Sequence, residues 1–185
     1  MNRIAIIGTS CSGKTTLACN ISKILHIPHF ELDHLFWQEN WQTLERELFR
    51  SKVRKAVQHE RWVVDGNFSI VRDLIWEKAD TIIWLDYPFH VVFLQALTRS
   101  IKRIVTKEQL FGNNVESFRQ TFFTKNSILY WILHTHWKYK STYSHLIRKT
   151  KKQVIKLHST RDKNNFLGNL TNQKGTYKGV KKISF

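Results

Sequence analysis

Short apolar segments alternate along this chain with longer segments of helical periodicity. The first apolar run breaks at Gly8, and Pro28 stands at the start of the second, where a missing N–H is tolerated. Because the short runs are apolar at nearly every position, and not only at alternate ones, we expect strands that are buried on both faces, as in a parallel sheet covered by helices. The pattern predicts an α/β fold whose five strands are residues 3–7, 27–32, 61–66, 79–86 and 153–159.

Between the strands, apolar residues recur every three or four positions, which predicts helices. The segment 41–57 is the most clearly amphipathic, with Trp41 and Leu48 among the residues of its apolar face. No internal repeat interrupts this alternation. The predicted helices are residues 15–25, 41–57, 70–78, 90–105 and 117–148, and another helix starts after the last strand.

The length of 185 residues and the 42% share of hydrophobic residues indicate one globular domain, which we place at residues 1–167. Residues 168–185 have little to bury, and we expect a basic, mobile tail there. The apolar runs are too short to span a membrane, and two cysteines make no disulfide framework. These features predict a cytoplasmic protein that does not contact membranes.

The net charge of +16 is concentrated near the C-terminus. Residues 138–185 carry 13 Lys and Arg against one acidic residue, whereas residues 1–137 carry 17 against 13. A basic segment can bind nucleic acid by releasing counterions from phosphates, and it can equally be a solvated chain end. Both interpretations stay open at this point.

The sequence "GTSCSGKT" follows the first predicted strand and precedes the first predicted helix. It fits the phosphate-binding pattern G-x-x-x-x-G-K-[ST], in which glycines let backbone N–H groups approach an anion at a helix N-terminus. The lysine adds a charge near the β- and γ-phosphates, and the hydroxyl after it can bind Mg²⁺. The residues expected to contact ATP are Gly8, Ser10, Cys11, Ser12, Gly13, Lys14, Thr15 and Thr16.

A phosphate loop in a chain of this size, without a guanine-specific motif, indicates a small phosphotransferase. Three aspartates follow predicted strands, at the sheet edge where ligands of such folds gather. Asp33 can orient or deprotonate an acceptor, and Asp65 can hold Mg²⁺ together with Thr15. Asp86 is more typical of a turn residue, and a turn or a helix cap is the alternative for all three.

The predicted helix 90–105 has an apolar face that includes Leu94 and Ile101, with Arg99 and Arg103 on the opposite face. Phosphoryl transfer needs positive charge beside the migrating group. The arginines are therefore candidates for catalysis, and a solvated helix face is the alternative.

We expect a mobile, helical lid at about residues 99–119, with Arg119 at its far end. Trp37, which follows Asp33 closely, is a candidate for the wall of an acceptor pocket. Arg72 is a candidate for binding the acceptor.

Four segments together resemble the bacterial topology-modulation proteins, which are related to adenylate kinases: "IAIIGTSCSGKTTLA", "IPHFELDHLFWQENW", "WVVDGNFSIVRDLIWEKADTIIWLDYP" and "FGNNVESFRQTFFTKNSILYWILHTH". The resemblance covers about residues 3–165. It implies a P-loop nucleoside-triphosphate hydrolase fold of the nucleoside-monophosphate-kinase type. It also implies that Asp65 is the acid associated with Mg²⁺, and that Ser159 and Arg161 lie near the adenine.

The chain departs from the adenylate-kinase pattern after Asp65, where "DGNFS" replaces D-G-F-P-R. The arginine that would bind AMP is missing there, so we expect another acceptor, with Arg72 as a possible replacement. The main hypothesis is a phosphotransferase that uses ATP and Mg²⁺ on an unidentified acceptor. The alternative is a nucleotide-dependent regulator that binds nucleic acid and affects DNA topology.

Overall fold

A parallel five-stranded sheet forms the centre of the computed structural model, which describes residues 1–107 and 127–178, with side chains up to residue 172. The strand order is β2-β3-β1-β4-β5, so the first strand is the central one, and every pairing is parallel. The predicted α/β fold is confirmed. The strands are β1 (Arg3–Gly8), β2 (His29–Glu31), β3 (Trp62–Asp65), β4 (Thr81–Leu85) and β5 (Gln153–Leu157).

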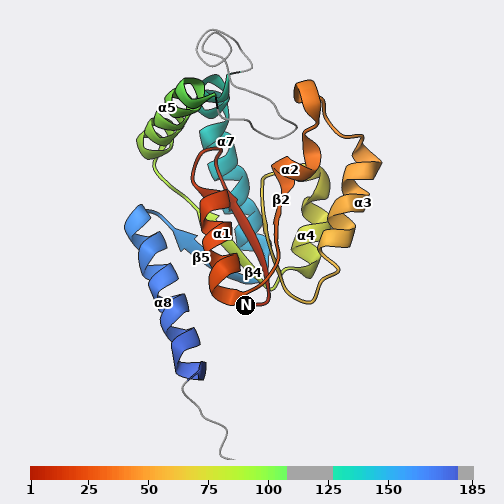
Figure 1. Ribbon diagram of the computed structural model, residues 1–185, viewed down its shortest axis with the longest axis vertical. Helices are drawn as coiled ribbons and strands as arrows, with labels where there is room; N and C mark the ends of the chain where they lie inside the picture. Colours follow the sequence, from red (N-terminus) through yellow and green to blue (C-terminus); the bar gives the residue numbers. More distant parts are fainter. Residues whose placement is uncertain (108–126, 179–185) are drawn as a thin grey trace, which may run out of the picture.

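Helices cover both faces of the sheet (Figure 1), and the apolar core consists of two clusters of buried residues, one on each face. One cluster packs α1 (Lys14–Leu25), α5 (Phe89–Thr106) and α8 (Thr160–Lys178) on the sheet. The other packs α2 (Leu32–Phe36), α3 (Arg46–Ala56) and α4 (Arg72–Lys78) on it. The long helix α7 (Ile128–Lys149) contributes Leu129 and Ile132 to the first cluster and Tyr143 to the second.

Helix α3 is shorter than the predicted segment 41–57. Trp41 lies in a separate 3₁₀ turn, Glu39–Trp41, in which Asn40 and Trp41 both have positive φ angles, 54° and 56°. Residues other than glycine rarely adopt this conformation, and it cannot continue into a right-handed helix. Leu48, predicted on the apolar face, is 48% exposed, and the helix is instead anchored by Phe49 and Val53.

The predicted orientation of α5 is wrong. Leu94 and Ile101 are 62% and 48% exposed, while Val92, Ala96 and Ser100 form the buried stripe. Arg99 and Arg103, predicted on the outer face, are half-buried. The periodicity of large apolar residues gave the wrong face because the small side chains of Ala96 and Ser100 allow the closest packing.

Two predicted boundaries differ from the structure. Helix α7 begins at Ile128, where the hydroxyl of Ser127 accepts a hydrogen bond from the Leu129 amide over 3.1 Å. Helix α8 continues past Gly168 to Lys178, into the segment predicted as a tail.

The part of the predicted lid beyond residue 107, including Arg119, lies outside the described residues, as do residues 117–126 of the predicted helix. A helix start after the last strand was expected, and α8 begins there. In the described part of the chain, no helix is long and apolar enough to cross a membrane.

The glycine after β3 gives a test of the packing that places Asp65. Gly66 has a φ of 139°, and a Cβ there would lie 2.7 Å from Leu32 Cβ. We expect Gly66→Ala to lower the free energy of unfolding by about 1–3 kcal/mol, measured by urea denaturation. Gly168→Ala is the matched control, because nothing lies within 4 Å of that Cβ position in α8, and it should raise stability by about 0.5–1 kcal/mol. Equal stabilities of both variants would contradict this account.

Candidate active site

The turn from β1 into α1 is built for close approach of the backbone to a ligand. Gly8 ends the strand with a φ of 153°, and a Cβ there would lie 2.8 Å from the Leu85 carbonyl oxygen. Gly13 has a φ of 89° and stands at the N-terminus of α1, which no side chain caps. The first N–H groups of α1 therefore have no partner within the helix and suit an anion.

Two polar side chains in this loop fit a bound phosphate. The hydroxyl of Ser12 is buried, and no hydrogen-bond partner for it exists among the described residues. The Lys14 ammonium donates to the Thr9 carbonyl oxygen over 3.0 Å. Burial lowers the pKa of Lys14, and the nearby carboxylates of Asp33 and Asp65 oppose that shift. Phosphate oxygens would accept from both groups.

Residues that the sequence analysis missed hold the loop from two sides. The Asn67 side chain donates to the Gly8 carbonyl and accepts from the Gly8 amide, which ties the loop to the end of β3. On the other side, the Thr9 hydroxyl lies 3.4 Å from Nδ1 of the buried His136 in α7. Burial lowers the pKa of His136, which favours the neutral imidazole. The "DGN" sequence was the only available signal for Asn67.

The carboxyl ends of β2 and β3 bring a cluster of polar groups to Thr15. Its hydroxyl lies 2.8 Å from Asp65 Oδ2 and 3.1 Å from Glu31 Oε1. His29 Nε2 donates to the other oxygen of Asp65 over 2.6 Å. Burial and the neighbouring Asp65 raise the pKa of Glu31. Glu31 and His29 were not predicted, although they are two apart on β2 and so share a face.

This cluster fits a magnesium ion held in part by phosphate oxygens and water. Hydroxyl and carboxylate oxygens are the ligands that Mg²⁺ prefers, and it commonly uses only one or two carboxylates beside a nucleotide. Among the described residues, no group of three or more His, Cys, Asp and Glu side chains is arranged to hold a metal ion by itself. Thr15 and Asp65, the predicted ligands, do lie together.

Asp33 lies at the start of α2, close to Lys14. Trp37 donates its indole N–H to Asp33 Oδ1 over 3.3 Å. Burial raises the pKa of Asp33, and Lys14 is the strongest opposing influence. Trp37 packs edge-on against Phe36 and Trp41, and its predicted role as a wall of the acceptor pocket stays a prediction.

The inward side of α5 adds positive charge to the site. Arg99 is near enough to influence both Lys14 and Asp33 electrostatically. Its Nε is buried and has no hydrogen-bond partner in the part of the chain that the structure describes. Arg103 follows one turn later on the same half-buried side.

The remaining candidates lie farther along the sheet edge. Asp86 pairs with Lys140 at 3.3 Å and His158 at 3.5 Å, which agrees with a structural role. The Ser159 hydroxyl accepts from the Asp162 amide and caps α8, and Arg161 is exposed in its first turn. No contact described here joins Ser159 or Arg161 to the loop after β1, so their place near an adenine stays a prediction.

Solved structures of small-molecule kinases are similar to this chain. Shikimate kinase from Bacteroides thetaiotaomicron matches with a TM-score of 0.56 and 17% identity, over 94% of this chain and 98% of that one. Shikimate kinase from Aquifex aeolicus vf5 matches with a TM-score of 0.53 and 18% identity, over 96% of this chain and 99% of that one. A gluconokinase from Sinorhizobium meliloti 1021 matches with a TM-score of 0.54 and 16% identity, over 95% of this chain and 97% of that one.

These similarities and the strand order show the P-loop nucleoside-triphosphate hydrolase fold of shikimate kinase. At such low identity they show the fold alone. Neither protein-family models nor curated proteins match the sequence. The resemblance to the topology-modulation proteins therefore gains no support, and an effect on DNA topology stays a prediction.

The lowered pKa of Lys14 predicts a stability cost in the nucleotide-free protein. Because the folded protein disfavours the charged form, Lys14 costs free energy of folding at neutral pH, and the cost fades as pH rises toward the ordinary pKa of 10.5. We expect Lys14→Met to raise the Tm at pH 7, with a smaller gain at pH 10, and to remove stabilisation by ADP. Lys23→Met, at an exposed position of the same helix, is the control. A lowered Tm for Lys14→Met at pH 7 would contradict the assignment.

Proposed function

We propose that this protein is a phosphotransferase that uses ATP and Mg²⁺ to phosphorylate a small acceptor. The observation that carries the proposal is the convergence of Lys14, Asp33 and Arg99 beside an uncapped helix N-terminus. The fold shared with shikimate kinase and a gluconokinase supports this class.

In this proposal each side chain acts where charge changes during transfer. The loop amides and Lys14 would bind the β- and γ-phosphates, and Thr15 with Asp65 would hold the metal directly or through water. Magnesium would supply charge neutralisation between the phosphates. Arg99, with Arg103 behind it, stabilises the charge on the migrating group.

Asp33 faces the acceptor and accepts the proton of its hydroxyl group. A general base works best when its pKa lies near the working pH. The burial that raises the pKa of Asp33 moves it in that direction. Trp37 fixes one carboxylate oxygen through its indole N–H and leaves the other for the acceptor.

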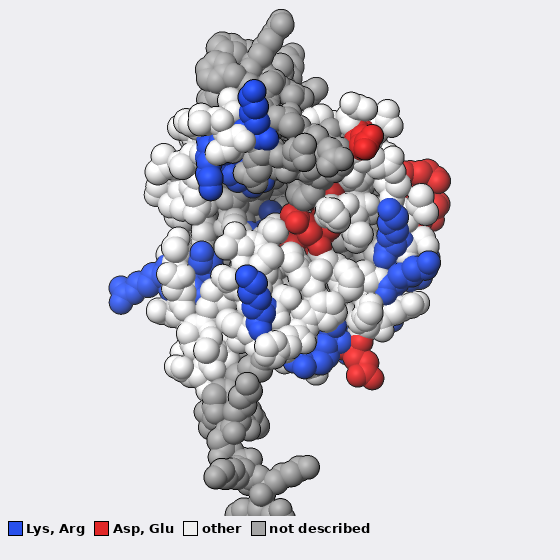
Figure 2. Space-filling view, viewed as in Figure 1, with Lys and Arg blue, Asp and Glu red and all other residues white. Residues whose placement is uncertain are grey.

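A nucleic-acid-binding regulator is the second predicted function, and the face drawn in Figure 2 shows no feature that favours it. On the face in Figure 2, Lys and Arg side chains are spread among uncharged ones, and acidic side chains lie near the centre. A nucleic-acid site normally gathers basic residues on one face or stripe. The small-molecule reaction is supported by the groups around Lys14 and by the fold shared with small-molecule kinases.

The proposal predicts release of ADP that depends on an acceptor. Sugar acids, other hydroxy acids, nucleosides and nucleoside monophosphates should be screened with MgATP in a coupled assay. With the active acceptor class, we expect Lys14→Ala to lower kcat/KM by roughly 10²–10³-fold, as loss of a charge-stabilising group does. Lys23→Ala should leave it unchanged. The proposal fails if nucleotide does not bind or if Lys14→Ala retains full activity.

Arg99 gives a separate test of the catalytic arrangement. Since its role is confined to the transition state, Arg99→Gln should lower kcat by roughly 10²-fold and change KM little. Lys102→Gln, an exposed position on the same helix, is the matched control. A variant that changes only KM would assign Arg99 to ground-state binding and contradict the catalytic role.

A further inference from the structure

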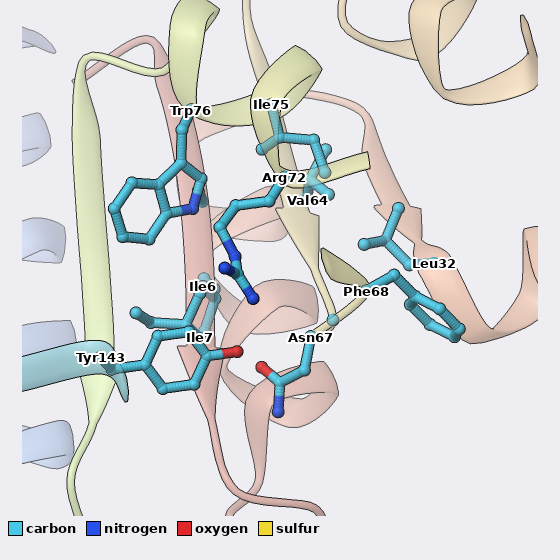
Figure 3. A pocket seen from close by; sticks show the side chains of 12 residues that line it. Ile6, Ile7, Leu32, Val64, Asn67, Phe68, Arg72, Ile75, Trp76 and Tyr143 are labelled. Atoms are coloured by element: carbon cyan, nitrogen blue, oxygen red, sulfur yellow. The ribbon is translucent and has the colours of Figure 1, made fainter. Parts of the chain in front are cut away.

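A cavity opens beside the loop on the side of the sheet covered by α4 and α7 (Figure 3). It is narrow, with an interior volume of about 10 Å³ that is enough for about one water molecule, and part of it is open to solvent. Leu32 and Gly66 line it, and these are the chain neighbours of Asp33 and Asp65. Asp33 and Arg72 both influence the pKa of Tyr139, one turn before Tyr143, so Asp33 lies in the same part of the molecule as the cavity.

Arg72 places an uncompensated positive charge in this cavity. No carboxylate among the described residues forms a salt bridge with it, and its guanidinium carbon lies 5.9 Å from the centre of the Tyr143 ring. Arg50, on the neighbouring helix, is different, because Asp73 receives two of its hydrogen bonds, at 2.9 and 2.7 Å. Arg50 joins α3 to α4, whereas the guanidinium of Arg72 points into the cavity toward Tyr143 and Asn67 (Figure 3).

Tyr143 adds a buried hydroxyl that lacks a proper partner. The residue is 1% exposed, and no acceptor for its O–H exists among the described residues. The Arg72 guanidinium acts on the hydroxyl oxygen as a hydrogen-bond donor and opposes the effect of burial on its pKa. Burial raises that pKa, so the phenol keeps its proton and can donate it. Figure 3 shows the hydroxyl directed into the cavity. A buried donor without a partner costs free energy unless a ligand accepts from it.

The side chains that line the cavity around Arg72 and Tyr143 favour one class of ligand. Most of the lining is apolar, so water inside is restricted and a charged hydrogen bond is strengthened. A guanidinium offers a planar pair of donors that matches the two oxygens of a carboxylate or phosphate. Asn67 connects this cavity to Gly8 of the loop. The apolar and aromatic lining residues besides Tyr143 are Ala5, Ile6, Ile7, Leu32, Val64, Phe68, Ile75 and Trp76.

We propose that Arg72 and Tyr143 bind an oxyanion, a carboxylate or a phosphate, of the acceptor molecule, and so orient its hydroxyl group toward Asp33. The inference rests on the proposed function, since it takes the cavity as the acceptor side of the same site. It selects anionic small molecules over neutral sugars and nucleosides as substrates.

The test is an NMR titration of the full chain, saturated with MgADP so that the loop is occupied. The probes are inorganic phosphate and acetate, and the readout is the side-chain Nε–H resonance of Arg72, assigned with Arg72→Lys. We expect a saturable shift with at least one probe. Tighter binding of phosphate identifies a phosphorylated acceptor, and tighter binding of acetate a carboxylic acid.

Matched variants separate a binding role from a structural one. Arg72→Gln should weaken binding of the probe roughly tenfold or more, followed on the remaining cavity resonances, and Arg72→Lys should restore part of it. Tyr143→Phe should weaken it severalfold without changing the fold, measured by circular dichroism. Arg61→Gln, at an exposed position, should have no effect. The inference is overturned if neither anion gives a saturable shift, or if Arg72→Gln binds as tightly as Arg61→Gln.

Failure of the proposed function would be visible separately. If MgADP does not bind, the phosphotransferase proposal is wrong, and the anion titration is then made with Lys14→Ala, in which the loop lacks its ammonium group. Binding at Arg72 in that variant would support an anion site independent of phosphoryl transfer. Absence of binding in both proteins would reject the site itself.

Discussion

Parallel pairing of three strands is the constraint on which the site depends. Asp65 lies opposite Ile6 of β1 on one side and Glu31 of β2 on the other. Parallel strands end at the same edge of the sheet, so carboxylates far apart in sequence meet the loop that follows β1. A shift of β2 by one residue would turn Glu31 and His29 to the opposite face and separate both from Asp65.

The charged groups at this edge are held in positions where burial disfavours their charged forms. Lys14 has a lowered pKa, while Glu31 and Asp33 have raised ones, and burial is the largest cause in each case. The Ser12 hydroxyl nearby is buried without a partner among the described residues. Polar groups held in this way lower stability, and the apolar clusters on both faces of the sheet offset that cost.

The sequence was sufficient to predict the sheet, the loop and the proximity of Thr15 to Asp65, because the motif and the strand ends are local signals. It was insufficient for Glu31 and His29, since β2 has only three residues and so short a strand shows no clear alternation. The orientation of α5 was predicted wrongly because Leu94 and Ile101 are exposed. Tyr143 could not be predicted, because α7 offers several aromatic residues at helical spacing and only packing shows which one reaches the cavity.

Helix α7 links the two halves of the candidate site. His136 contacts Thr9 of the loop, and Tyr143 reaches the cavity beside Arg72. These residues are seven apart, which is about two helical turns, so they lie on nearly the same side of α7 some 10 Å apart along its axis. Because a helix resists compression, the distance between the loop after β1 and the cavity is fixed by the helix itself. If Arg72 and Tyr143 bind an acceptor as proposed, that distance restricts the length of the acceptor.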